Sequence, residues 1–105
     1  MSKGQRIKFK TWDCELNRGE YQNGRTALEL VAWEDNEADE IYEGEPIATC
    51  TINIPECSLA ADEVIIKDYS ENEGMLQALL DAKVVELTGR EVQSGFITAP
   101  ICILC

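Results

Sequence analysis

The chain contains no histidine, and this absence removes the usual general base at neutral pH. It also excludes every Ser-His or Cys-His arrangement for nucleophilic catalysis. A Gly-rich phosphate-binding loop is missing as well, because Gly89, Gly95 and their neighbours do not match the required spacing. Carboxylate-pair chemistry stays formally open with 20 acidic residues, but no two of them stand out as an acid and a base. We therefore predict a protein that is not an enzyme and needs no cofactor.

Long hydrophobic runs are also lacking. The N-terminal stretch MSKGQRIKFK has basic residues but no apolar segment behind them, and no window approaches the roughly 18 apolar residues of a membrane span. This pattern indicates neither export nor membrane insertion, so we expect a cytoplasmic protein. The five cysteines are an odd number at irregular spacing without a signal peptide, which favours reduced thiols over a disulfide framework.

Basic residues are scarce: 9 Lys and Arg stand against 20 Asp and Glu, for a net charge of −11. The imbalance is concentrated in residues 34–81, where Lys67 is the one base among fourteen acids. A field of this sign repels nucleic acid and anionic membrane and accelerates encounters with a basic protein. We therefore expect a basic protein partner, and no direct binding to nucleic acid or membrane.

The residues that are present favour a single domain over 1–105, rich in strands. Apolar and polar residues alternate in residues 5–12, and Asn23-Gly24 between two extended segments predicts a hairpin with a tight primed turn. Residues 47–55 form a further predicted strand, with Ala48, Cys50, Ile52 and Ile54 on one face. Residues 63–69 form another, and a closing strand contains Pro100, which suits an edge or a bulge.

One segment has helical spacing instead. Ser70 and Glu73 fit a capping box, and the apolar residues that follow predict a helix over about 71–83. Thr88-Gly89-Arg90 indicates a turn after it. The predicted fold class is α+β, a twisted antiparallel sheet of five or six strands packed against this one main helix. The second face of the sheet is partly open in this prediction, so that Trp12, Trp33 or the Cys-rich C-terminus offers a partner interface, including one for a homodimer.

The most acidic stretch is WEDNEADEIYEGEP at residues 33–46, in which half of the residues are carboxylates. A calcium loop is excluded by spacing: if Asp35, Glu37 and Asp39 are the first three ligands, Glu40 occupies the place of the required glycine and Pro46 that of the bidentate glutamate. No metal site is expected. Two interpretations remain, a solvated connection and a binding surface. For the second, the candidate partner-binding residues are Glu34, Asp35, Glu37, Asp39, Glu40, Glu43, Asp68, Glu71 and Glu73.

Cys102 and Cys105 have the CxxC spacing of redox and zinc sites. In a strand, residues three apart point to opposite faces, so the two sulfurs should diverge. No second CxxC or histidine completes a zinc site. We interpret these cysteines as ordinary apolar residues.

Three segments carry a resemblance to a known family: YQNGRTALEL at 21–30, DEVIIKDYSENEGMLQALLDAKVV at 62–85 and SGFITAPICIL at 94–104. The chain resembles, from about residue 14 to 104, a family of small acidic proteins of unknown function from bacteria, their phages and conjugative elements. KDYSENEGM is the most particular segment. The resemblance supplies no catalytic residues. It implies a genomic setting, since mobile elements encode many small acidic proteins that block host defence nucleases.

Two functional hypotheses follow. The first is a non-enzymatic binding protein of a mobile element that inhibits a host defence nuclease through an acidic surface mimicking nucleic acid. The alternative is a small accessory or interaction domain, including a homodimer, whose acidity mainly serves solubility.

Overall fold

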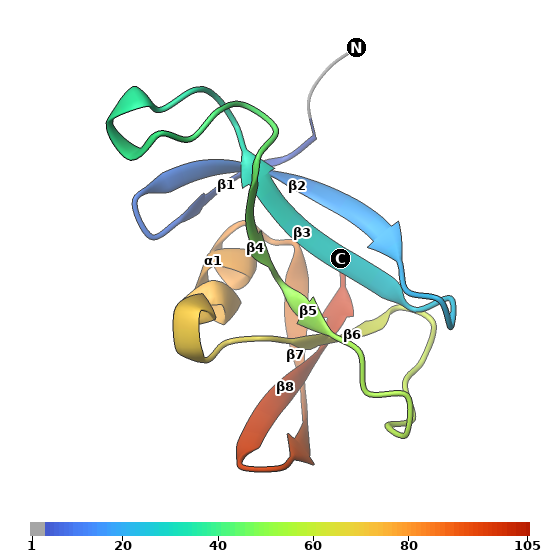
Figure 1. The fold of residues 1–105 in the computed structure, drawn as a ribbon. Coiled ribbons are helices and arrows are strands. Elements are labelled where there is room, and N and C mark those ends of the chain that lie inside the picture. Colours follow the sequence, from blue (N-terminus) through green and yellow to red (C-terminus); the bar gives the residue numbers. More distant parts are fainter. Residues whose placement is uncertain (1–3) are drawn as a thin grey trace.

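Eight strands form two antiparallel sheets in the computed structural model, which describes residues 4–105 (Figure 1). The first sheet has the order β1-β2-β3-β4 and the second the order β5-β6-β8-β7. The strands are β1 (Arg6–Phe9), β2 (Trp12–Glu20), β3 (Thr26–Ala32), β4 (Pro46–Thr49), β5 (Thr51–Ile52), β6 (Glu63–Ile66), β7 (Val85–Ser94) and β8 (Ile97–Leu104). The helical elements are α1 (Met75–Asp81) and two short 3₁₀ turns, η1 (Glu37–Asp39) and η2 (Ser70–Asn72). The α+β class is confirmed, but the expectation of one sheet with five or six strands is wrong.

Cys50 is the residue at which the chain passes from one sheet to the other. Its amide donates to Leu28 O of β3 at 2.8 Å, and its carbonyl accepts from the amide of Lys67, directly after β6, at 2.8 Å. Thr51 is buried beside it because its hydroxyl has partners, the Leu28 amide at 3.2 Å and the Tyr21 hydroxyl at 2.8 Å. The predicted continuous strand 47–55 is therefore split by a bend.

The predicted strand at residues 5–12 is also divided. Ile7 and Phe9 are buried as expected, but Lys10 has φ +57° and Thr11 lies exposed in a turn that leads into β2. The hairpin at Asn23-Gly24 is confirmed, since β2 pairs with β3 from Glu20↔Thr26 onward. Its turn differs from the primed type, because only Gly24 has a positive φ, at +85°.

The helix is shorter than predicted, and the predicted capping box does not cap it. Ser70 lies in η2, and α1 begins only at Met75. The side chain that caps α1 is Asp68, whose Oδ1 accepts from the amides of Gly74 at 3.1 Å and Leu76 at 2.8 Å. Asn72 is buried and ties η2 to β4 through a 2.6 Å bond from Nδ2 to Thr49 O. The prediction of a main helix over 71–83 is thus wrong in both length and cap.

The predicted turn at Thr88-Gly89-Arg90 is a bulge inside β7. The register between β7 and β8 shifts between Leu87 and Arg90, where Gly89 has φ +85°. Pro100 lies in β8, an interior strand rather than the expected edge. The last pair between β6 and β8 is Ile65↔Ile101, so Pro100 comes just beyond the paired segment and its missing N–H costs no ladder bond to β6.

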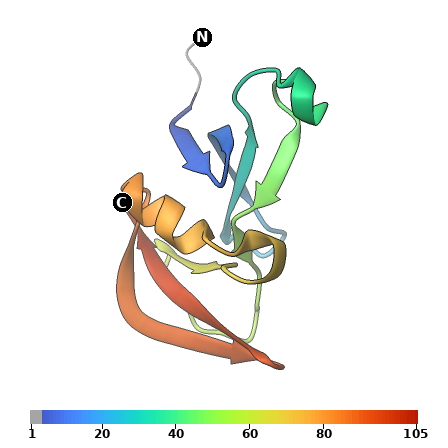
Figure 2. The ribbon, with the colours of Figure 1, turned by 90° about the vertical axis from the view of Figure 1, so that its left-hand side faces the viewer.

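The main hydrophobic core lies between the two sheets and α1. Ile7 and Phe9 of the first sheet, Val64 of the second and Met75 and Leu79 of α1 belong to it. In Figure 2, α1 lies between the first sheet and the β7–β8 hairpin, and it contacts the edge strands β1 and β7 of the two sheets. The helix therefore covers the core where the two sheets are not paired with each other.

Candidate acidic binding site

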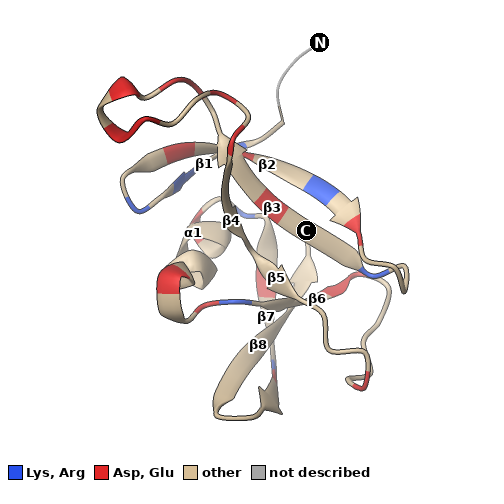
Figure 3. Ribbon diagram, in the orientation of Figure 1, with Lys and Arg blue, Asp and Glu red and all other residues tan. Residues whose placement is uncertain are grey.

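The connection between β3 and β4 is an acidic loop, residues 33–45, which projects from one end of the first sheet (Figure 3). It is held in shape by its own backbone. The Asn36 amide donates to Ile41 O at 2.7 Å and the Ile41 amide to Asn36 O at 3.0 Å. The side chain of Asn36 caps η1 by accepting from the Asp39 amide at 3.3 Å. The acidic loop is thus an ordered structure rather than a slack connection.

Two carboxylates of the acidic loop hold it in place. Asp39 Oδ2 accepts from the indole Nε1 of Trp12 at 3.2 Å and from Asn36 Nδ2 at 3.0 Å. Asp35 Oδ1 accepts from the Glu43 amide at 2.8 Å. The bond to Trp12 ties the tip of the loop to the start of β2.

The side chains of Glu34, Glu37 and Glu40 are exposed and contact no cation within residues 4–105. No Lys or Arg occurs between residues 34 and 45, so the loop provides no compensating charge of its own. Within the acidic loop, these three glutamates are the predicted residues that are available to a partner.

The predicted residues Asp68, Glu71 and Glu73 lie on a different segment, between β6 and α1. The turn between β1 and β2, with basic residues, lies between this segment and the acidic loop (Figure 3). Lys10 of that turn donates to Glu71 O at 2.7 Å. The carboxylate of Glu71 is paired with Lys67 at 2.5 Å, which lowers its pKa. Asp68 accepts two backbone amides at the start of α1, so Glu73 is the one side chain of this group with neither a hydrogen bond nor an ion pair within the described residues.

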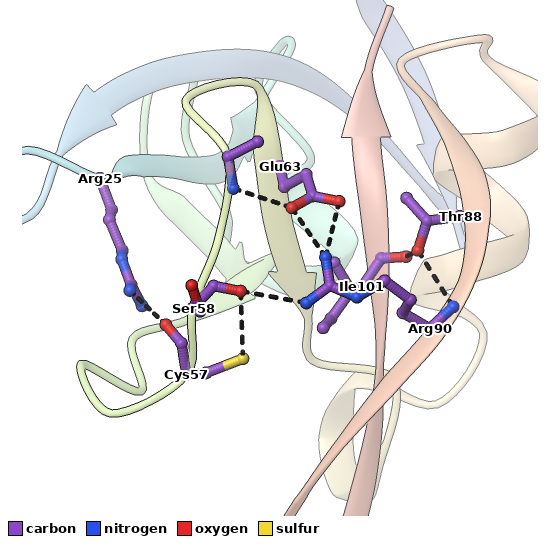
Figure 4. A network of polar contacts seen from close by, with 8 residues as sticks. Arg25, Cys57, Ser58, Glu63, Thr88, Arg90 and Ile101 are labelled. Atoms are coloured by element: carbon purple, nitrogen blue, oxygen red, sulfur yellow. Dashed lines mark hydrogen bonds and ion pairs between the residues drawn. The ribbon is translucent and has the colours of Figure 1, made fainter.

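The segment between β5 and β6 is acidic in sequence but is held by arginines (Figure 4). Arg90 forms two bonds to the Glu63 carboxylate, at 3.0 and 3.1 Å, and donates to Ser58 O at 3.1 Å. A bond from the Ala60 amide and the Arg90 guanidinium together lower the pKa of Glu63. Arg25 donates to Ile54 O at 2.7 Å and to Cys57 O. Arg25 and Arg90 therefore fasten this segment through its carbonyls and through Glu63 at the start of β6, whereas the acidic loop contains no basic residue.

A cavity of about 400 Å³ lies beneath the acidic loop, between it and the start of β2. Its apolar lining consists of Trp12, Ala32, Ile41 and Ile47, and its carboxylate lining of Asp13, Glu34, Asp35 and Glu37. Asp13 is paired with Arg6 at 3.2 Å, which lowers the pKa of that carboxyl. The Arg6 guanidinium also lies 5.2 Å from the ring centre of Trp33. The sequence does not indicate this cavity, because its lining comes from β2, β3, β4 and the loop.

The large exposed apolar side chains are Tyr42, Leu87 and Phe96, whereas Trp12 and Trp33 are half-buried. The expected apolar surface therefore lies elsewhere than at the tryptophans. Phe96 is fully exposed at the tip of the β7–β8 hairpin.

The thiols of all five cysteines are free. Cys102 is buried in the core, whereas Cys105 is exposed and follows the end of β8. Burial raises the pKa of Cys14 to about 11, of Cys50 to about 12 and of Cys102 to about 11. These three thiols are neutral at physiological pH, as expected of apolar core residues.

Comparison with known proteins found no matching family, no matching curated protein and no matching solved structure. The resemblance to small acidic proteins of mobile elements therefore stays a prediction. No helix within residues 4–105 has the length and apolar character needed to cross a membrane. The same residues contain no group of three or more His, Cys, Asp or Glu side chains arranged to hold a metal ion.

Proposed function

We propose that this chain is a non-catalytic binding protein that uses its acidic loop to bind a basic protein. The observation that carries this proposal is the state of Glu34, Glu37 and Glu40: exposed, without a cation in contact, and mounted on a loop that is ordered by its own hydrogen bonds. An ordered loop loses less conformational entropy on binding than a slack one. A connection that served only solubility would not need this order.

The partner that fits best is an enzyme with a Lys- and Arg-rich groove for nucleic acid, such as a defence nuclease. The net charge of −11 and the genomic setting implied by the family resemblance support this class. The basic turn between β1 and β2 interrupts the acidic surface, so the contact is centred on the acidic loop rather than on a long continuous track.

A role without catalysis is supported by the carboxyls themselves. The carboxyls with a displaced pKa, Asp13, Glu63 and Glu71, are all shifted downward by a hydrogen bond or a basic neighbour. A general acid at neutral pH needs the opposite shift.

The test is capture of partners from host lysate at about 50 and about 500 mM salt, followed by competition between the protein and DNA for the captured partner. We expect a basic nucleic-acid-binding protein that is retained at low salt, released at high salt and displaced by DNA. A partner whose capture is equal at both salt concentrations, or which binds DNA and this chain together, would contradict the proposal.

A second candidate, a homodimer, is favoured by a separate observation. Strand β7 forms an edge of the second sheet, and Leu87 and Phe96 on its hairpin are exposed. Edge strands with apolar side chains are common sites of pairing between chains. Sedimentation equilibrium of the wild-type chain and of Phe96→Ser decides it: a dimer lost in the variant supports this function, and a monomer at all concentrations excludes it.

A further inference from the structure

We propose that the cavity beneath the acidic loop receives one arginine side chain of the partner. This inference rests on the proposed function and adds to it the specific group that is recognised. The first step is the shape: a hollow of about 400 Å³ has room for a side chain, whereas a flat acidic surface attracts a partner only through its charge.

The chemistry of the lining fits an arginine. Trp12, Ile41 and Ile47 provide an aromatic and aliphatic wall for the methylene stem, and Glu34 and Glu37 provide carboxylates for the guanidinium. Neither glutamate has a cation in contact within the described residues. Arginine combines a flat, weakly hydrated head with a donor geometry that matches carboxylates, and it stacks on aromatic rings more readily than lysine.

The same end of the molecule already holds an arginine in this way. The guanidinium of Arg6 lies 5.2 Å from the ring centre of Trp33 and 3.2 Å from Asp13 Oδ2. Asp13 is also part of the cavity lining, so the internal arginine site adjoins the cavity. A tryptophan with a carboxylate beside it is thus a combination that this surface uses for its own arginine.

The ring of Trp12 is fixed for this purpose. Its indole Nε1 donates to Asp39 Oδ2 at 3.2 Å, and its side chain packs against the main core. A ring held at both ends presents the same wall before and after binding, so little order has to be gained.

The acidic loop provides a matched pair of variants. Glu34→Gln with Glu37→Gln removes two charges that line the cavity, and Glu43→Gln with Glu45→Gln removes two from the same loop outside the lining. The probes are three short peptides, acetyl-Gly-Xaa-Gly-amide, in which Xaa is arginine, lysine or citrulline. Citrulline has the shape of arginine without its charge.

Binding is measured by titration of the ¹⁵N-labelled chain, followed through its amide and indole NMR signals. We expect the arginine peptide to shift the signals of Thr11, Trp12 and Glu37, with the lysine peptide weaker and citrulline silent. The Glu34→Gln/Glu37→Gln variant should bind the arginine peptide about tenfold more weakly, as expected for the loss of a charge-assisted bond, and the control variant should bind as the wild type does.

Equal loss in both double variants, equal binding of the lysine or citrulline peptide, or no binding of the arginine peptide would overturn the cavity assignment. The proposed function is judged separately. If a basic partner binds the wild-type chain and both double variants weaken it alike, the acidic loop is the binding surface but the cavity holds no arginine. If no basic partner binds at all, the proposed function itself fails.

Discussion

At the scale of residues, hydrogen bonds decide which carboxylates are structural and which are free to meet a partner. Asp35, Asp39, Asp68 and Glu71 each accept a bond or pair with a lysine. Glu37, in contrast, is exposed and contacts no cation within residues 4–105. An acidic residue count alone therefore overstates the surface that can bind.

Substitution of Asp68 tests whether this residue, rather than the predicted capping box, caps α1. Asp68→Ala removes the acceptor for the Gly74 and Leu76 amides and should lower the free energy of unfolding by about 1 kcal/mol, the usual effect of a lost helix cap. Glu73 belongs to the predicted capping box. The free energy of unfolding of Glu73→Gln should stay within about 0.5 kcal/mol of the wild-type value. Urea denaturation of both variants measures the difference. A larger loss of stability in Glu73→Gln than in Asp68→Ala would show that the predicted capping box, and not Asp68, caps the helix.

The buried thiols predict how stability changes at high pH. Burial raises the pKa of Cys50 from 9.0 to about 12, while the same thiol in the unfolded chain ionises near its ordinary value. The unfolded state then loses protons first, so the stabilisation is complete below pH 9 and is lost as the pH rises toward the folded pKa.

Urea denaturation under reducing conditions, at intervals from about pH 8 to 11, follows this loss. Cys50→Ala should show a shallower decline of the unfolding free energy with pH, whatever its stability at pH 8. An unchanged slope in the variant would mean that Cys50 ionises equally in both states.

At the scale of elements, backbone geometry at single positions shapes the two sheets. Strand β7 continues through its bulge because Gly89 adopts φ +85°, a conformation that costs other residues energy. The bulge aligns Arg90 with Ile101 of β8, from where its guanidinium reaches Glu63.

Gly89→Ala should therefore destabilise the chain by about 1–2 kcal/mol, the cost of a left-handed conformation with a Cβ atom. Gly19→Ala in β2 is the matched control, because an added Cβ there meets nothing within 4 Å and its φ is not left-handed. The control should be neutral or slightly stabilising. Thermal unfolding compares the two variants. Equal effects would show that the bulge does not require glycine at position 89.

Local patterns in the sequence predicted those elements that depend only on residues close together in the chain. Alternation located β1, Asn23-Gly24 located the β2–β3 hairpin, and the predicted strand at 63–69 contains β6. Two of the failures share a physical cause, since each depends on a strand elsewhere in the chain. The bend at Cys50 needs β3 on one side and the end of β6 on the other, and the Gly89 bulge is defined by β8. Neither dependence is visible in a local pattern.

The candidate site was predictable to a similar degree. The acidic loop was evident from composition, and so was its lack of a calcium-loop spacing. Its cavity was not, because Trp12 and Ile47 come together with Glu37 only through the first sheet. The engagement of Asp68 at α1 was likewise hidden by the stronger local pattern of Ser70 and Glu73.

At the scale of the whole molecule, some acidic regions are contacted by basic side chains and others contain none. Arg25 and Arg90 hold the segment before β6, and Lys10 and Lys67 contact η2, while the acidic loop has no basic residue of its own. We propose that the net charge of −11 brings a basic partner toward the molecule and that the exposed glutamates of the acidic loop bind it.

The measurement that tests this account most directly is the salt dependence of the dissociation constant for the captured basic partner. The loop variant Glu34→Gln/Glu37→Gln/Glu40→Gln is compared with a remote variant, Glu20→Gln/Glu56→Gln/Glu91→Gln, which changes the net charge equally at other exposed positions. The account predicts that the loop variant binds weakly with a shallow salt dependence, and that the remote variant keeps the affinity and nearly the steep salt dependence of the wild type. Equal weakening of both variants would contradict it, because the partner would then respond to total charge rather than to the acidic loop.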